Sequence, residues 1–183
     1  PDRMDKQDVY RIFDYNLAYE IRLRDALEEK MLTPFHYVGV EDYEANGQIV
    51  NETTNLRYLT ADRRIKYVLK EMEYYGYCGK RACGLVFCSR QEEAKIIADS
   101  FTRLGHPAIA LTNQDNATVR QRTISLLQSG KIEYIVTVDL FNEGVDIPEL
   151  NQIVMLRNTQ CSIVCVQEGG RGWRECPNKE GVT

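Results

Sequence analysis

Short apolar runs alternate with amphipathic helical segments throughout the stretch from residue 60 to residue 156. Strands that alternate with helices of 10 to 15 residues are typical of βαβ units, in which right-handed crossovers build a parallel sheet. We therefore predict an α/β fold whose parallel sheet is flanked by helices. The expected strands are 83–88, 108–111, 132–138 and 152–156, and the expected helices are 60–76, 89–104, 117–129 and 162–169.

Helix boundary signals support this division. Thr60 can act as the N-cap of a helix that Gly76 ends. Ser89-Arg90-Gln91-Glu92 has the form of a capping box and predicts the start of a helix that places Leu104 inward and stops at Gly105. Gly130 closes the next helix in the same way.

The first 59 residues have a different pattern. Residues 6–32 carry apolar side chains at helical spacing, and the run 35–40 is aromatic and β-branched, as in a strand. Residues 41–55 are polar and without periodicity, which predicts a turn or loop. We divide the chain into a helical and strand extension, residues 1–59, and an α/β domain, residues 60–183.

The composition is that of an ordinary soluble protein, with 43% apolar and 27% charged residues and a net charge of −4. No apolar run is long enough to cross a membrane and the first residues do not resemble a signal peptide, so we expect a cytoplasmic protein. The six cysteines include no C-x-x-C pair, which favours free thiols over a zinc site, and we assign no metal ligands.

Ligands of parallel sheets bind at the carboxyl ends of the strands. The residues that follow the predicted strands are Ser89-Arg90, Thr112-Asn113 and the segment 139–148. We expect them to share one functional edge of the sheet.

The most informative segment is Gln167-Glu168-Gly169-Gly170-Arg171-Gly172-Trp173-Arg174. Two arginines three residues apart near a helix end can project together towards a triphosphate. The guanidinium group is permanently charged and matches phosphate oxygens, so it stabilises the charge that develops in phosphoryl transfer. From these residues alone, an ordinary surface arginine pair fits equally well.

A second segment, 137–148, crowds the acidic side chains Asp139, Glu143 and Asp146 into a turn with Gly144. Such carboxylates can bind a metal ion or act as general acid and base. Acidic residues in turns more often accept hydrogen bonds from backbone amides, and this segment by itself does not distinguish the two.

Taken in order, three segments resemble helicase motifs IV, V and VI of superfamily 2. Residues 84–90, GLVFCSR, resemble motif IV, and TVDLFNEGVDIPEL, from Thr137, resembles motif V. QEGGRGWR, from Gln167, has the Q-x-x-G-R-G-x-R form of motif VI. The closest likeness is to DEAD/DEAH-box-like helicases that include the type III restriction-enzyme motor subunits. The resemblance implies a RecA-like, P-loop-NTPase-like fold, namely the second motor domain of a helicase or translocase.

The resemblance also implies residue roles. It implies that the nucleotide is ATP with Mg²⁺ and that the bound nucleic-acid strand is DNA, with RNA possible. Arg171 and Arg174 would be arginine fingers that reach the ATP, and Gln167 would help to couple the nucleotide to the domain interface. The remaining implied contacts are nucleotide contacts at Gly144, Asp146 and Gly170, and nucleic-acid backbone contacts at Thr137, Ser89, Arg90 and Thr112.

The chain departs from the family pattern at Gly169 and Trp173, where relatives usually have apolar residues, and at Glu168. A glycine in the helix that carries the fingers costs up to about 1 kcal/mol. The sequence also holds no G-x-x-x-x-G-K-[ST] loop. We expect the first RecA-like domain of the same polypeptide to hold ATP, and these residues to be a catalytically silent fragment that begins after motif III.

Two other classes of function fit the sequence less well. A degenerate helicase-like module could serve as a non-catalytic docking platform for nucleic acid or protein, although both arginines are present. A small-molecule α/β enzyme using Asp139 and Asp146 would need a nucleophile or metal set that the sequence does not offer.

Overall fold

The computed structural model describes residues 36, 38–41, 43–45, 47–49, 54–138, 147–157 and 182–183, all of which belong to a compact unit spanning residues 33–183. The predicted helices 6–32 and 162–169 and the segments 139–146 and 158–181 lie outside the described residues. The proposed boundary at residue 59 therefore stays a prediction.

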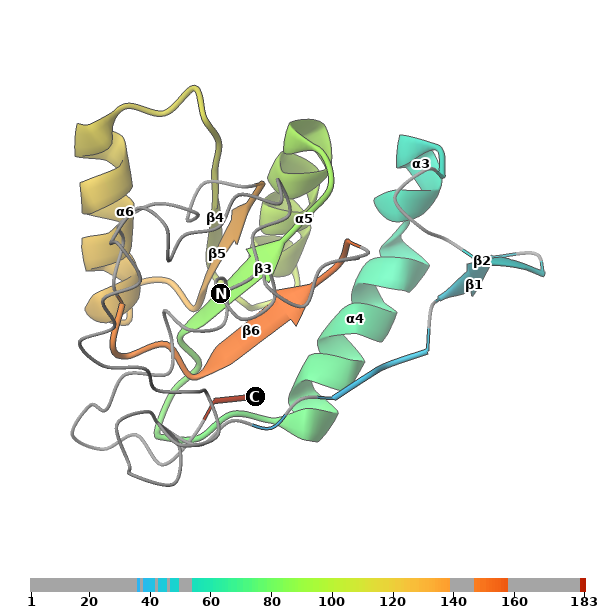
Figure 1. The fold of residues 1–183 in the computed structure, drawn as a ribbon, viewed down its shortest axis with the longest axis horizontal. Coiled ribbons are helices and arrows are strands. Elements are labelled where there is room, and N and C mark those ends of the chain that lie inside the picture. The colour runs from blue at the N-terminus through green and yellow to red at the C-terminus, as the bar shows by residue number, and fades with distance from the viewer. Residues whose placement is uncertain are drawn as a thin grey trace, which may run out of the picture. The chain divides into compact units, whose positions relative to one another are not determined.

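Four parallel strands form the central sheet (Figure 1). They are β3 (Gly84–Phe87), β4 (Ala108–Leu111), β5 (Tyr134–Thr137) and β6 (Gln152–Met155), in the spatial order β4-β5-β3-β6. All three pairings are parallel, so the α/β prediction is confirmed. The predicted strand at 108–111 has the observed bounds, and the other three are shorter than predicted.

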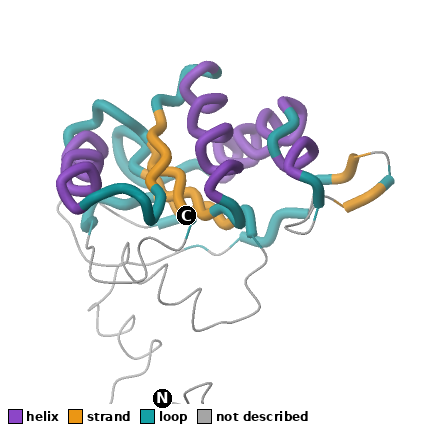
Figure 2. The backbone as a smooth tube through the Cα atoms, turned by 90° about the horizontal axis from the view of Figure 1, so that it is seen from above, coloured by secondary structure: helices purple, strands orange, loops and turns teal. Residues whose placement is uncertain are grey.

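The described helices are α3 (Leu56–Leu59), α4 (Asp62–Tyr75), α5 (Gln91–Arg103) and α6 (Ala117–Gln128). Figure 2 shows helices on both sides of the strands. Side chains of α4 and α5 pack in one core cluster, whereas α6 contributes to the other. The sheet is thus covered on both faces, which explains why β3 and β5 are buried along their whole length.

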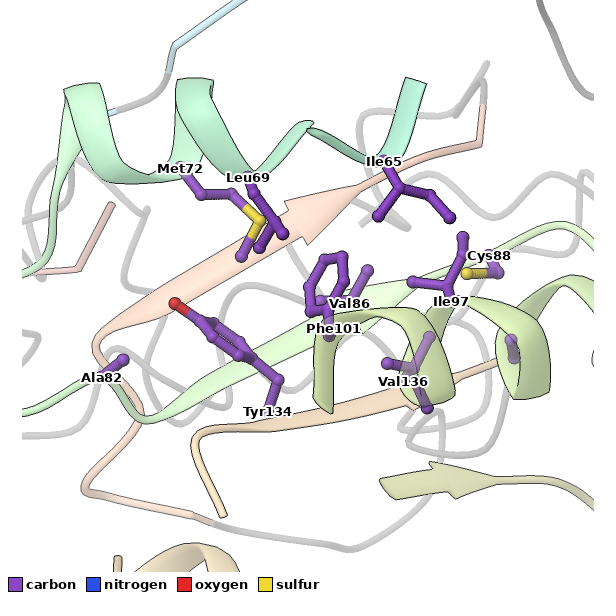
Figure 3. Close-up of a cluster of buried hydrophobic side chains, with 12 residues drawn as sticks. Ile65, Leu69, Met72, Ala82, Val86, Cys88, Ile97, Phe101, Tyr134 and Val136 are labelled. Carbon is purple, nitrogen blue, oxygen red and sulfur yellow. The ribbon is translucent and has the colours of Figure 1, made fainter. Parts of the chain in front are cut away.

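The core cluster that α4 and α5 form with the sheet is built around aromatic and branched side chains (Figure 3). Ile65, Leu69 and Met72 recur at helical spacing on α4 and point at the sheet. Phe101 of α5 meets Tyr134 of β5 edge to face, with ring centroids 5.8 Å apart. This geometry is favourable for aromatic pairs, and it fixes α5 against the middle of the sheet.

The opposite face buries alternate residues of the same strands. Leu85 and Phe87 of β3 and Ile135 of β5 pack with Leu127 of α6. The cluster also takes in Ile147 and Leu150 from the end of the predicted motif V. The end of that segment is therefore part of the core.

Glycines end three of the helices as predicted. Gly76 is the C-cap of α4 with a φ of 66°, and Gly105 and Gly130 follow α5 and α6 with φ of 99° and 74°. Positive φ values favour glycine because it lacks a Cβ atom.

Two predictions about helix ends were wrong. Thr60 is the C-cap of α3, and its hydroxyl donates to the carbonyl of Leu56, while α4 begins one turn later without a side-chain cap. Because the one-turn helix α3 precedes α4, the Thr60 hydroxyl donates to a carbonyl of α3, and Thr60 does not serve as the N-cap of α4. Leu104 is 37% exposed because α5 ends before it.

The segment predicted as a loop contains a small hairpin, β1 (Glu44–Ala45) and β2 (Gln48–Ile49), with Gly47 at a φ of 75° in its turn. An Asn-Gly pair is the strongest short-range hairpin signal, and the prediction of a turn or loop did not include the two paired strands. The strand predicted at 35–40 was also wrong, since the described residues 36 and 38–40 form no strand.

The outer edge of β6 also carries backbone hydrogen bonds. The amide of Ile153 donates to the carbonyl of Thr183, and the amide of Thr183 donates to the carbonyl of Asn151. The amide of His36 in turn donates to Val182. Residues 182–183 therefore lie beside β6 and satisfy part of its edge.

Candidate functional site at the carboxyl edge of the sheet

The strand register brings the predicted site residues of the described part to one edge. Thr137 ends β5 and is aligned with Leu111 of β4 on one side and Phe87 of β3 on the other. Thr112 directly follows β4, and Ser89 and Arg90 follow β3 after one intervening residue. Neighbouring strands are about 4.8 Å apart, so these loops are adjacent, as expected from a parallel sheet.

Ser89 is held by a buried carboxylate. Its backbone amide and its hydroxyl both donate to Oε2 of Glu93, at 3.1 and 2.8 Å. The capping pattern predicted Glu92 as the acidic partner, but Glu92 is exposed, and Arg90 is the N-cap of α5 without a side-chain cap bond. Both donors of Ser89 are thus engaged, and a phosphate could take the hydroxyl proton only by displacing a carboxylate.

Thr112 is held in the same way. Its amide and its hydroxyl donate to Oδ2 of Asp115, at 2.7 and 3.0 Å, and its side chain is buried. A hydroxyl residue in each of the two loops is therefore bound to a carboxylate three or four positions later. These bonds fix the loop backbone, which is the role that Asp and Ser commonly have in turns.

A further side-chain contact joins the two loops. Nε2 of Gln91 donates to Oδ1 of Asn113 at 2.6 Å. Since β3 and β4 lie on either side of β5, this bond links the loops that flank the end of β5. It ties the first turn of α5 to the loop before α6.

Two buried polar atoms of the described residues have no hydrogen-bond partner: Oγ1 of Thr137 and Nε of Arg120. Arg120 lies in the first turns of α6, and its Nη2 donates to the carbonyl of Asn113 at 3.4 Å, so its guanidinium also belongs to this edge. Buried polar groups are nearly always paired, and unpaired ones call for an explanation. Sequence reasoning singled out Thr137 but missed Arg120, whose only signal is a basic residue in the first turns of a helix at the functional edge.

Burial and charge shape the one thiol at this edge. The pKa of Cys88 is raised well above its usual value, first by burial and then by the negative charge of Glu93. Arg64 and Arg157 act in the opposite direction but do not cancel this effect. The thiol therefore stays neutral and behaves as a small apolar side chain.

The residues with predicted nucleotide contacts lie outside the described part of the chain. They are Gly144, Asp146, Gln167, Gly170, Arg171 and Arg174. Within the described ranges, no group of three or more His, Cys, Asp or Glu residues could hold a metal ion. No helix of the same ranges combines the length and apolar character that a membrane span requires.

The parallel sheet, its covered faces and the polar loops at its carboxyl edge define the RecA-like class of α/β domains. The family model of the helicase conserved C-terminal domain matches residues 64–176, more than half of the chain. The chain belongs to this family.

Two curated relatives illustrate the range of the family. A probable ATP-dependent RNA helicase of Methanocaldococcus jannaschii is 24% identical over 123 residues, which are 64% of this chain and 31% of that protein. The EcoKI endonuclease subunit, a type I restriction enzyme of Escherichia coli, is 32% identical over 105 residues, or 51% of this chain and 9% of that protein. The chain thus spans less than a third of the length of either relative.

Solved structures agree on the fold. The E. coli DEAD-box protein SrmB, bound to regulator of ribonuclease activity A, matches with a TM-score of 0.54 and 18% identity. The match covers 70% of this chain and 69% of that one. At this level of identity the likeness establishes the fold.

Proposed function

We propose that the chain is the second motor domain of an ATP-dependent nucleic-acid helicase or translocase. In this role it supplies Arg171 and Arg174 as arginine fingers and contacts the nucleic-acid backbone. Closure of the cleft between two motor domains brings the fingers to the γ-phosphate, where they stabilise charge in the transition state. The first RecA-like domain of the same polypeptide holds ATP and Mg²⁺, since these 183 residues contain no P-loop.

The observation that carries this proposal is that two buried polar atoms at the carboxyl edge, Thr137 Oγ1 and Arg120 Nε, have no hydrogen-bond partner. A backbone-tracking site needs donors that carry no sequence information, and a guanidinium and a hydroxyl fit phosphate oxygens. Thr137 is fully buried, so its contact would require the structure around it to open when nucleic acid binds.

We further propose DNA as the strand, with RNA as the other outcome of the test. The match to a restriction-enzyme endonuclease subunit and the motif V and VI forms favour a restriction-type motor. The match to a probable RNA helicase favours RNA. Hydrolysis of ATP by the full-length protein with single-stranded DNA, duplex DNA and RNA separates these possibilities.

The decisive test is replacement of each arginine. In the full-length protein, Arg171→Ala and Arg174→Ala should each lower the kcat of ATP hydrolysis by about 10³-fold while leaving ATP binding largely intact. Unchanged turnover in both variants would refute the assignment of Arg171 and Arg174 as arginine fingers.

The same assay also tests the docking-platform alternative. A degenerate module would bind nucleic acid or protein with no ATP hydrolysis in the full-length wild-type protein. Nucleic-acid-stimulated turnover that depends on either arginine excludes it.

A further inference from the structure

Arg64 of α4 and Glu93 of α5 form an ion pair that is almost completely removed from water. The side chains are 6% and 0% exposed, and Nη1 lies 3.2 Å from Oε1. Removing two charges from water costs as much as their attraction returns, and apolar residues of similar volume often serve stability equally well. The burial of this pair therefore calls for a reason other than stability.

Glu93 divides its two oxygens between different segments. Oε1 accepts from Arg64, while Oε2 accepts from the amide and the hydroxyl of Ser89. The carboxylate thereby fixes the turn that leaves β3, in the segment that resembles motif IV. A glutamine at this position would present an amide N–H₂ to one of these donors.

Arg64 contacts the backbone of two further segments. Its Nη1 donates to the carbonyl of Leu59 at the end of α3, and its Nη2 lies 3.5 Å from the carbonyl of Leu156. Leu156 directly follows β6 and leads towards the segment that carries Arg171 and Arg174. The pair thus connects the turn after β3 with the end of β6.

We propose that Arg64 and Glu93 are positioning residues that hold the Ser89 turn and the end of β6 in fixed relation. A nucleic-acid contact at the Ser89 turn is thereby transmitted to Arg171 and Arg174, which follow β6 in the sequence. The transmission rests on the proposed function, whereas the positioning does not.

The first experiment separates position from stability in the 183-residue chain. The double variant Arg64→Met/Glu93→Leu replaces the pair by apolar side chains. We expect a urea midpoint close to that of the wild type, because the lost desolvation cost offsets the hydrogen bonds that the pair made to Ser89, Leu59 and Leu156. Hydrogen exchange at the Ser89 amide should nevertheless speed up at least about tenfold, because its acceptor is lost.

A matched control exists on the same two helices. Arg103 of α5 and Asp62 of α4 are 2.9 Å apart, but their side chains are 64% and 72% exposed. The double variant Arg103→Gln/Asp62→Asn should change neither the urea midpoint nor exchange at Ser89. It shows what the loss of an ion pair between α4 and α5 does by itself.

The second experiment uses the full-length protein and nucleic-acid-stimulated ATP hydrolysis. The apolar double variant should lower the stimulated kcat about tenfold, with KM for ATP within about twofold, because nucleotide binding depends on the other domain. The Arg103→Gln/Asp62→Asn control should match the wild type in both parameters.

Each outcome decides a specific point. Unchanged exchange at Ser89 overturns the proposal, and so does a double variant that fails to fold, because the pair would then serve stability. Faster exchange with unchanged stimulated kcat supports positioning and refutes transmission. A wild-type protein without any nucleic-acid-stimulated hydrolysis refutes the proposed function, and the exchange measurement still decides the positioning role.

Discussion

Carboxylates bind the hydroxyl residues that follow β3 and β4, Ser89 and Thr112, and this repetition defines the edge at the scale of single residues. Glu93 binds Ser89, and Asp115 binds Thr112, in each case through one oxygen that accepts from both the amide and the hydroxyl. Each hydroxyl is thus already bound to a carboxylate and is not free to donate to a phosphate. Arg120, whose Nη2 donates to the carbonyl of Asn113 in the loop after β4, is therefore better placed than the hydroxyls to contact phosphate.

The neutral thiol of Cys88 makes stability depend on pH in a defined direction. Its folded pKa is raised by burial and by Glu93, whereas an unfolded thiol has a pKa of about 8.5. The unfolded state therefore loses its proton first. Stability is fully present below the unfolded pKa and is lost as pH rises towards the folded pKa, by up to about 1.4 kcal/mol per pH unit.

Urea unfolding under reducing conditions at pH 7.5, 8.5 and 9.5 measures this slope. The Cys88→Ala variant should be less stable at pH 7.5 because it leaves a small cavity, but its stability should fall less steeply with pH. Burial also raises the pKa of Tyr134, which adds a second loss at higher pH that both proteins share. Identical slopes in the two proteins would contradict the prediction.

Gly84 is required by the close approach of a neighbouring ring. A Cβ atom at this position would lie 2.6 Å from two ring carbons of Tyr134 and 3.2 Å from the carbonyl oxygen of Gln152. The ring is buried and its hydroxyl is bonded to the Gln152 side chain at 2.9 Å, so it cannot yield freely. Gly84→Ala should lower the free energy of unfolding by about 1–3 kcal/mol.

Gly39→Ala is the matched control for this substitution. A Cβ atom there would meet nothing within 4 Å. Its effect should stay within about 0.5 kcal/mol in the same denaturation assay. A Gly84→Ala protein as stable as this control would show that β3 and β5 can separate without cost.

At the scale of elements, two adjacent polar residues hold the amino ends of the strands. Asn151 accepts from the amide of Cys83 and donates to the carbonyls of Cys78 and Arg81. Gln152 donates to the carbonyls of Met72 and Gly76 at the end of α4. The loop between α4 and β3 is therefore fixed by side chains that come from β6 and the residue before it.

Replacing Asn151 by aspartate keeps the shape but removes both donors. The carboxylate would face two carbonyl oxygens in a buried site, and we expect a loss of about 3 kcal/mol in the free energy of unfolding. Asn113→Asp, at an exposed position where the side-chain oxygen accepts from Gln91, serves as the control and should cost little. Equal stability of the two variants would contradict the assigned role of Asn151.

Local patterns predicted the four strands of the central sheet and the middle of α4, α5 and α6, because burial on both faces and helical spacing depend on neighbouring residues. The bonds that build the edge are harder to foresee. The pairing of Ser89 with Glu93 was within reach of a four-residue spacing, but Arg64 and Leu156 are 92 residues apart in sequence. Nothing in a local pattern indicates that these two residues meet.

At the scale of the whole molecule, a net charge of −4 argues against binding nucleic acid through a broad basic surface. A backbone contact must therefore come from individual groups, and Arg120 is the described guanidinium with a buried, unpaired nitrogen. One phosphate contact to a single strand accounts for about 0.7 in the slope of log K against log salt concentration. Arg120→Met in the full-length protein should weaken binding to a single-stranded oligonucleotide and reduce that slope by this amount.

Arg122 provides the comparison, since it lies on the same helix, carries the same charge and is exposed. Arg122→Met removes one unit of charge without removing the proposed contact. It should leave the slope close to the wild-type value, with affinity measured by fluorescence anisotropy between about 50 and 200 mM salt. Equal slopes for the two variants would mean that α6 contributes general charge and that the unpaired nitrogen of Arg120 is not part of a phosphate site.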